Sequence, residues 1–372
     1  WIDEQSQYAW PKHPVIRIDF SKVPSADAVK LEEELNHRLL EIGRGYDIEL
    51  SKDRVSAGNI GELISNLYRK TGERVVILID EYDSPIISNI NNAEVAAANR
   101  KLLAEFYRTI KASDEYLRFM FLTGVSKFAK VSVFSGLNNL VDITLDAEYC
   151  TLLGYTQEEL ESYFGEGIDL VTKLLDTERS ELLENIRRWY NGYRFSRAET
   201  KVYNPFSVLL FFSKKEFDNY WFETGTPTFL IDLIRKNDYD LRLIHEREIS
   251  SRGFNSYEID NIPILPVLFN TGYLTISQVE RPDITQTDFI LNYPNNEVRI
   301  SFLEQFIDSA FSEGTTARSY TRKLTKSIRA DNLEQVIAII KTFFAEIPYD
   351  LKSANCHSEA YYQSLVYCIF KL

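Results

Sequence analysis

Five apolar residues in a row, 75–79 (VVILI), lead directly into two acids, Asp80 and Glu81. Polar and apolar residues do not alternate in this run, so it predicts a strand that is buried on both faces. Such strands belong to parallel sheets that are covered by helices. The ligand site of a parallel sheet lies at the carboxyl ends of its strands, and the two acids are placed at such an end.

The first 150 residues alternate between strand patterns and helix patterns. Strands are predicted at 15–20, 75–79, 118–124 and 142–146, and helices at 26–40, 60–68 and 94–111. This order indicates βαβ units and therefore a parallel sheet. We expect an α/β domain over residues 1–150.

Beyond residue 150 the patterns are mostly helical. Helices are predicted at 157–164, 169–190, 205–212, 228–235 and 333–344, and strands at 272–276, 289–291 and 298–302. Thr156 and Glu159 have the spacing of a capping box at the first of these helices. We expect a helical lid at 151–235, a winged-helix-like and helical region at 236–350, and the start of a further domain at 355–372.

Composition limits the classes of function. The 372 residues have a formal net charge of −13, which disfavours general binding to duplex nucleic acid. No apolar run approaches the roughly 20 residues that span a bilayer. The three cysteines form neither a disulfide framework nor a metal pattern, which favours a reducing compartment. We therefore expect a cytoplasmic protein without a membrane partner.

Asp80, Glu81 and Thr123 are the first candidates for chemistry. Phosphoryl transfer from a nucleotide uses one carboxylate to hold Mg²⁺ and often a second to orient or deprotonate the attacking water. Asp80 and Glu81 match this Walker B arrangement, and Thr123 at the end of the next strand could contact a phosphate or the water. The alternatives are a solvated acidic turn for the two acids and an ordinary strand-to-loop transition for Thr123.

The phosphate-binding loop G-x-x-x-x-G-K-[ST] does not occur in these residues. The sequence starts at Trp1, contains a single methionine, Met120, and stops inside an apolar, helix-like run. These features predict a fragment of a longer protein, cut at both ends, in which the loop would precede Trp1.

Seven ordered stretches carry a resemblance to a known family: 75–86, 121–146, 154–160, 189–195, 202–209, 219–231 and 268–276. In them the chain resembles the bacterial AAA-ATPase-like family whose members have a C-terminal PD-(D/E)XK nuclease-like domain. The resemblance implies a P-loop NTPase core of the AAA or signalling-ATPase type, a helical lid and a winged-helix-like region. It further implies that this chain lacks the phosphate loop and the nuclease active site.

The resemblance also implies roles for individual residues, with ATP and Mg²⁺ as cofactors. Asp80 becomes the acid that holds Mg²⁺ through water, Glu81 the general base and Thr123 the sensor-like residue. Gly225 and Pro227 resemble a G-x-P turn whose proline packs near the adenine. The alternative for this turn is an ordinary helix start, since proline is favoured at the first helical position.

Several further residues are weaker candidates, each with a plainer alternative. Asp83 either orders the loop after the acids or is an exposed turn acid. Lys127, Lys130 and Asn138 lie where ATPases place charge-stabilising residues, and Trp189, Tyr190 and Tyr193 are either recognition aromatics or core packing.

Arg318, Arg322, Lys326 and Arg329 have spacings of four, four and three, so they form one basic stripe if the segment is helical. The stripe either contacts a nucleic-acid backbone or is a solvated helix face. Our main interpretation is an ATP-binding and ATP-hydrolysing body that gates a partner or the appended nuclease-like domain, and we expect a protein partner or an oligomer. The alternatives are a non-catalytic interaction scaffold that has lost its phosphate loop, and a nucleic-acid-binding protein.

Overall fold

The computed structural model describes residues 9–90, 92–125, 140–221, 230–231, 233–234, 239–245, 248–250, 253–254, 263–283, 286–311, 317–347 and 359–372. The chain divides into two compact units, which are described separately below. Unit 1 comprises Trp1–Val141 and Phe254–Pro263, and unit 2 comprises Asp142–Gly253 and Ile264–Leu372. The finer division of unit 2 into a lid and a winged-helix-like region stays a prediction.

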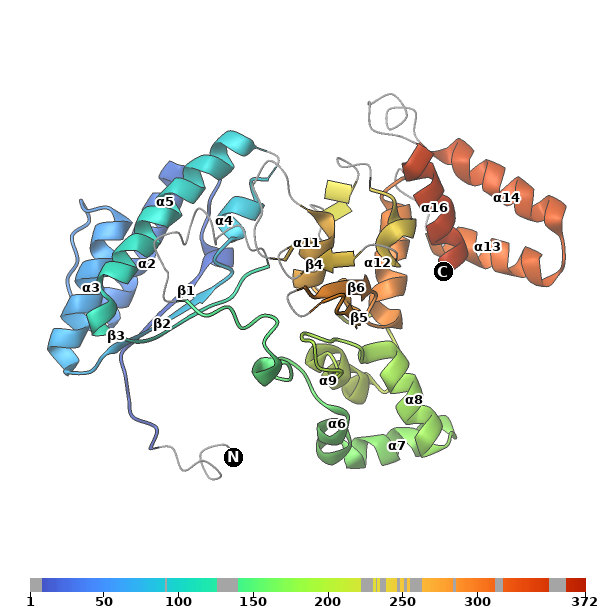
Figure 1. Ribbon diagram of the computed structural model, residues 1–372, viewed down its shortest axis with the longest axis horizontal. Helices are drawn as coiled ribbons and strands as arrows, with labels where there is room; N and C mark the ends of the chain where they lie inside the picture. The colour runs from blue at the N-terminus through green and yellow to red at the C-terminus, as the bar shows by residue number, and fades with distance from the viewer. Residues whose placement is uncertain are drawn as a thin grey trace. The chain divides into compact units, whose positions relative to one another are not determined.

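Unit 1 is built on a three-stranded parallel sheet with the order β1-β2-β3, as Figure 1 shows. The strands are β1 (Val15–Asp19), β2 (Val75–Asp80) and β3 (Leu117–Leu122). The run of apolar residues predicted as a buried strand is β2, the central strand of the three. The sequence-based expectation of a parallel sheet in an α/β unit is thus confirmed.

Three long helices lie on the same side of this sheet (Figure 1). They are α2 (Ala28–Gly45), α3 (Ser56–Thr71) and α5 (Ala93–Ala112), joined by the short α4 (Ser84–Ile87) and the 3-10 turns η1 (Phe20–Lys22) and η2 (Asp114–Tyr116). Apolar residues at helical spacing, such as Leu31, Leu35 and Leu39, are fully buried in this layer. The helices cover the sheet face that contains Ile16, Ile18 and Ile77.

The other sheet face differs from the prediction of a strand buried on both sides. Val76 and Leu78 of β2 are only half-buried, and their neighbours Val15 and Phe119 are 37% and 53% exposed. Strand pattern alone places side chains on two faces, but what covers each face depends on other elements. Among the described residues of unit 1, helices cover one face.

The predicted strand at 142–146 is wrong. This segment is irregular and contains a turn before the 3-10 helix η3 (Ala147–Tyr149). The Asp142 carboxylate accepts a hydrogen bond from the Thr144 N–H (3.1 Å), and Asp146 accepts one from the Glu148 N–H (3.0 Å). Short polar side chains that bond the nearby backbone favour turns over strands, which explains the difference.

Unit 2 begins with four helices that enclose an aromatic core. They are α6 (Gln157–Tyr163), α7 (Gly165–Leu175), α8 (Arg179–Tyr190) and α9 (Pro205–Lys214). The capping box of Thr156 and Glu159 is present at α6. The single helical stretch expected at 169–190 is two helices, because Asp176 has a left-handed backbone (φ 50°) that ends α7.

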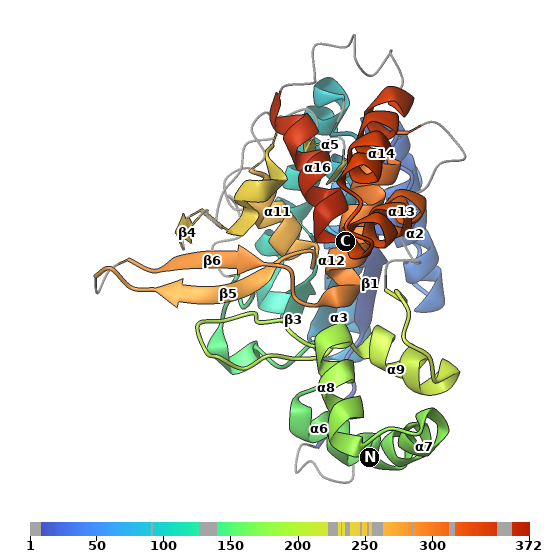
Figure 2. The same cartoon turned by 90° about the vertical axis from the view of Figure 1, so that its right-hand side faces the viewer.

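A small antiparallel sheet of unit 2 has the order β4-β6-β5. The strands are β4 (Glu248–Ser250), β5 (Thr275–Glu280) and β6 (Asp288–Asn292), and Figure 2 shows β5 and β6 as a hairpin. Residues 298–302, expected as a strand, belong to the helix α12 (Asn296–Asp308). The Asn295 side chain accepts a hydrogen bond from the Val298 N–H (3.0 Å), and this N-cap starts the helix.

The remaining elements of unit 2 are helical. They are η5 (Leu241–His245), α11 (Ile264–Asn270), α13 (Ala317–Arg329), α14 (Leu333–Glu346) and α16 (Glu359–Lys371). The helix expected at 333–344 is α14. In the ranges that the structure describes, no helix has the length and apolar character needed to cross a membrane.

Candidate functional site

The ends of β2 and β3 bring Asp80 and Thr123 together. The Thr123 hydroxyl donates a hydrogen bond to Oδ1 of Asp80. Two backbone bonds hold this arrangement: the Thr123 N–H donates to the Ile79 carbonyl (2.9 Å), and the Tyr82 N–H donates to the Thr123 carbonyl (3.0 Å). The two residues singled out at separate strand ends therefore form one pair, with the Asp80 side chain exposed.

Glu81 follows Asp80 in an unusual backbone conformation. Its φ is +53°, in the left-handed region that residues other than glycine seldom occupy. The Ser84 N–H donates to the Glu81 carbonyl (2.9 Å), which closes the turn into α4. Burial raises the pKa of the half-buried Glu81 carboxyl, and the neighbouring charges of Asp83, Asp80 and Asp19 raise it further. Strain at a residue is typical of functional positions.

Asp83 is fully buried, which corrects the plainer expectation of an exposed turn acid. Its Oδ1 accepts a hydrogen bond from the Val125 N–H (3.3 Å), so it holds the backbone at Val125, just after β3. A Cβ at Gly124 would lie 2.6 Å from Oδ1 of Asp83, so glycine is required for this close approach. Burial raises the pKa of Tyr107 well above its usual value, and the Asp83 charge adds to this effect.

Asp19 is a member of the site that the sequence patterns did not single out. It is the last residue of β1 and lies opposite Asp80 in the register of the sheet. It accepts hydrogen bonds from the Ser21 hydroxyl (2.6 Å) and N–H (3.1 Å), and Lys22 Nζ lies 2.7 Å from its Oδ2. Lys22 and Ser21 lower its pKa. The sequence feature that could have identified Asp19 is its position at the carboxyl end of a predicted parallel strand.

These residues suit one side of a metal–nucleotide site. Within the described ranges, no three His, Cys, Asp or Glu side chains are grouped so that they could hold a metal by themselves. Mg²⁺ does not need such a cage, because it is usually held by one or two carboxylates together with phosphate oxygens and waters. Asp80 fits this requirement, since its carboxylate is exposed at the strand ends and is oriented by Thr123.

The structure does not test the remaining predicted site residues. Gly225, Pro227, Lys127, Lys130 and Asn138 lie outside the described residues.

The aromatic candidates of unit 2 are core residues. Tyr190 and Tyr193 are 0% and 6% exposed, and Trp189 packs against the cluster that contains Tyr190. Burial raises the pKa of both tyrosines well above the usual value for a tyrosine. The packing alternative is therefore correct for these residues.

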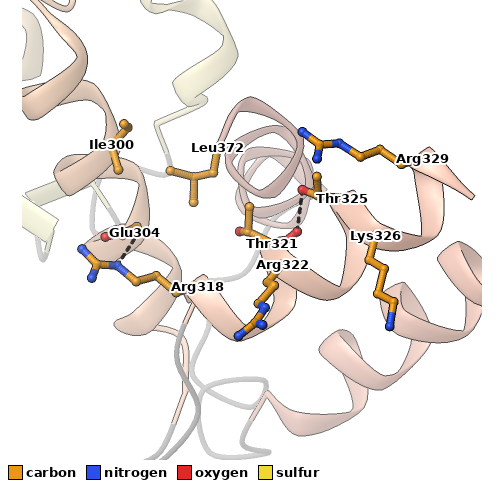
Figure 3. A pocket seen from close by; sticks show the side chains of 9 residues that line it. All are labelled: Ile300, Glu304, Arg318, Thr321, Arg322, Thr325, Lys326, Arg329 and Leu372. Carbon is orange, nitrogen blue, oxygen red and sulfur yellow. Dashed lines mark hydrogen bonds and ion pairs between the residues drawn. The ribbon is translucent and has the colours of Figure 1, made fainter. Parts of the chain in front are cut away.

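The segment that contains the predicted basic stripe is helical, as the prediction of a stripe requires. Arg318, Arg322, Lys326 and Arg329 all lie on α13, and all four line one cavity of about 560 Å³ in unit 2 (Figure 3).

Comparison with known proteins defines the class. Residues 1–134, which contain the three-stranded sheet and the acids at its strand ends, match the AAA-ATPase-like family, described as predicted AAA-ATPase. This match confirms the AAA-ATPase-like part of the resemblance.

A second comparison covers almost the whole chain. The chain is 38% identical over 372 residues to a protein of Azotobacter chroococcum mcd 1 named "Uncharacterized protein in vnfD 5'region". The match spans 99% of this chain and 69% of the Azotobacter protein, so the two proteins belong to one family, with a predicted AAA-ATPase region at residues 1–134. No solved structure matches the chain significantly.

Proposed function

We propose that unit 1 provides the metal and water side of a Mg-ATP site in an ATPase. The observation that carries the proposal is the hydrogen bond from Thr123 to Asp80, made at the carboxyl ends of two neighbouring parallel strands. Glu81 lies directly beside this pair. A nucleotide site is expected at such an edge, and the predicted AAA-ATPase match covers these residues.

Each residue has a distinct role in this proposal. Asp80 binds the metal through water, and Thr123 orients the Asp80 carboxylate. Glu81 accepts a proton from the attacking water, and its raised pKa makes it a better proton acceptor near neutral pH than an ordinary carboxylate. Bound Mg²⁺ neutralises negative charge on the phosphates during transfer. Asp83 and Asp19 position the surrounding backbone and increase the local negative field.

The phosphate-binding side of the site requires a further segment. Among the described residues, β3 pairs with β2 alone, and we propose that its other edge pairs with a further strand. A parallel strand at this edge would end beside Thr123, and a glycine-rich loop after it would supply backbone N–H groups for the phosphates. We propose that the intact protein contains this strand and loop, and that hydrolysis gates a protein partner or an appended nuclease-like domain.

The test is Mg²⁺-dependent ATP hydrolysis by the intact protein. Glu81→Gln should abolish turnover and preserve ATP binding, because the amide cannot accept the proton but keeps the side-chain shape. Glu105→Gln is the matched control, since Glu105 is an exposed residue of α5 outside the site. The 372 residues by themselves should bind ATP weakly.

Two outcomes would contradict the proposal. Unchanged turnover in Glu81→Gln would refute Glu81 as the base. An intact protein that neither binds nor hydrolyses Mg-ATP would leave the interaction scaffold as the better interpretation.

A further inference from the structure

A basic cavity in unit 2 has no role in the proposed ATPase reaction. It has a volume of about 560 Å³ and lies against α13, with Ile300 and Glu304 of α12 and Leu372 on its other side (Figure 3). Its cationic side chains come from successive turns of α13: Arg318, Arg322, Lys326 and Arg329.

All charged side chains of α13 are positive. The thirteen residues of α13 include five Lys or Arg and no Asp or Glu, in a chain whose net charge is −13. Glu304 is the acid that lines the cavity, and it is neutralised by Arg318, whose Nε lies 2.9 Å from its Oε1. Within the described part of the chain, Arg322, Lys326 and Arg329 are exposed and have no ion-pair partner.

The spacing of these cations suits a linear polymer of phosphates. Residues four apart on a helix are separated by about 6 Å along its axis, so the stripe presents a regular row of positive charge. A single phosphate could contact two neighbouring cations at most. A phosphodiester chain has a series of phosphates, so that each cation of the row can contact one of them. Lys and Arg side chains are the usual donors to nucleic-acid phosphates.

The cavity also contains groups that are not cationic. The hydroxyls of Thr321 and Thr325 donate to the helix carbonyls of Ala317 (3.0 Å) and Thr321 (2.8 Å), so their protons are already used. Recognition by this surface therefore depends on the charged groups. Ile300 and Leu372 add an apolar side to the cavity that sugar or base carbons can contact.

We propose that the row of Arg318, Arg322, Lys326 and Arg329 binds the sugar-phosphate backbone of nucleic acid, without reading its sequence. The net charge of −13 disfavours binding by the chain as a whole, so the row of cations carries the contact. Binding through phosphates depends steeply on salt. Contacts to three phosphates predict a fall in affinity of about 20- to 40-fold between about 50 and 200 mM salt.

The experiment measures fluorescence anisotropy of a labelled oligothymidylate and of a labelled duplex, titrated with the 372-residue chain in the absence of ATP. The double variant Arg322→Glu and Lys326→Glu should weaken binding at least about 10-fold and reduce the salt slope by about 2. Lys323→Glu is the matched control. Lys323 lies on the same helix but beside the Tyr320 ring, and it does not line the cavity, so its reversal should change affinity less than about 3-fold.

Several results would overturn the proposal. They are absence of binding to either nucleic acid at low salt, equal losses in Lys323→Glu and in the double variant, and equally effective competition by polyglutamate. Displacement by inorganic triphosphate at matched charge would assign the cavity to small anions instead. Circular dichroism confirms that each variant is folded, and the absence of ATP keeps this test independent of the proposed ATPase site.

Discussion

The carboxylate of Glu297, at the start of α12, accepts hydrogen bonds from the hydroxyl of Ser207 on α9, at 2.8 Å to Oε2 and 3.0 Å to Oε1. The Trp221 N–H donates to Oε1 as well (2.8 Å). Glu297 is fully buried, and its hydrogen-bond partners in the part of the chain that the structure describes, Ser207 and Trp221, carry no positive charge. One buried acid therefore joins two helices and a connecting segment of unit 2, at a cost in desolvation.

The stability of unit 2 should fall as the pH rises because of this acid. Burial raises the pKa of Glu297 to about 7 in the folded protein, from 4.5 for an unperturbed glutamate. Between these values the unfolded chain ionises and the folded one does not, so the free energy of unfolding decreases by about 3 kcal/mol from pH 4.5 to 7. Urea unfolding at several pH values measures this decrease.

Glu297→Gln should remove that component of the pH dependence, because the amide is neutral throughout. Glu280→Gln, an exposed residue of β5, should retain it. An identical pH dependence in Glu297→Gln and the wild type would contradict the assignment.

Gly192 should tolerate no side chain. Its φ is +109°, and a Cβ built at this position would lie 1.9 Å from the carbonyl oxygen of Pro294. Gly192→Ala should lower the free energy of unfolding by about 3 kcal/mol or more, because the backbone at residue 192 and the backbone at Pro294 would both have to move. Gly45→Ala is the control: no atom lies within 4 Å of its added Cβ, and alanine at this helix position should be neutral or stabilising by up to about 1 kcal/mol. Equal stabilities of the two variants would be inconsistent with this packing.

Glu81 should show a conflict between stability and activity. Asn tolerates the left-handed backbone better than Glu, and it removes repulsion from Asp83, Asp80 and Asp19. Glu81→Asn should raise the free energy of unfolding by about 1 kcal/mol and abolish ATP turnover of the intact protein. Glu81→Gln removes the charge but keeps the poor tolerance of a left-handed backbone. The free energy of unfolding should therefore rise less in Glu81→Gln than in Glu81→Asn, and the difference between the two variants measures the backbone strain. A destabilised Asn variant would argue against strain at this position.

Thr123 should act through its hydroxyl. Thr123→Val keeps the shape but leaves Asp80 without the hydrogen bond, so turnover of the intact protein should fall by about 10-fold or more. Thr123→Ser keeps the hydroxyl and should restore most of the rate. Steady-state kinetics with ATP binding measured in parallel distinguishes these cases, and equal rates for the Val and Ser variants would exclude the proposed role.

Local patterns predicted much of the architecture. The central strand β2, the helices of unit 1 and the capping box at Thr156 follow from hydrophobic spacing and cap chemistry, which act over a few residues. The expected burial of β2 on both faces does not, because it depends on which elements cover the sheet. Local reasoning was wrong where the pattern was short, as at 142–146 and at 298–302. There, side chains that bond the nearby backbone, including Asn295, decided the conformation.

The sequence by itself predicted that Asp80 and Thr123 lie at the ends of two consecutive strands, because that depends only on strand periodicity and the order of elements. The tertiary structure shows that these two strands are neighbours in the sheet. Only the tertiary structure decided that Asp19 lies opposite Asp80, that Asp83 is buried, and that Glu297 joins two helices. Strand register, burial and desolvation depend on contacts between segments far apart in the chain. The spacing of residues along the chain therefore cannot predict them.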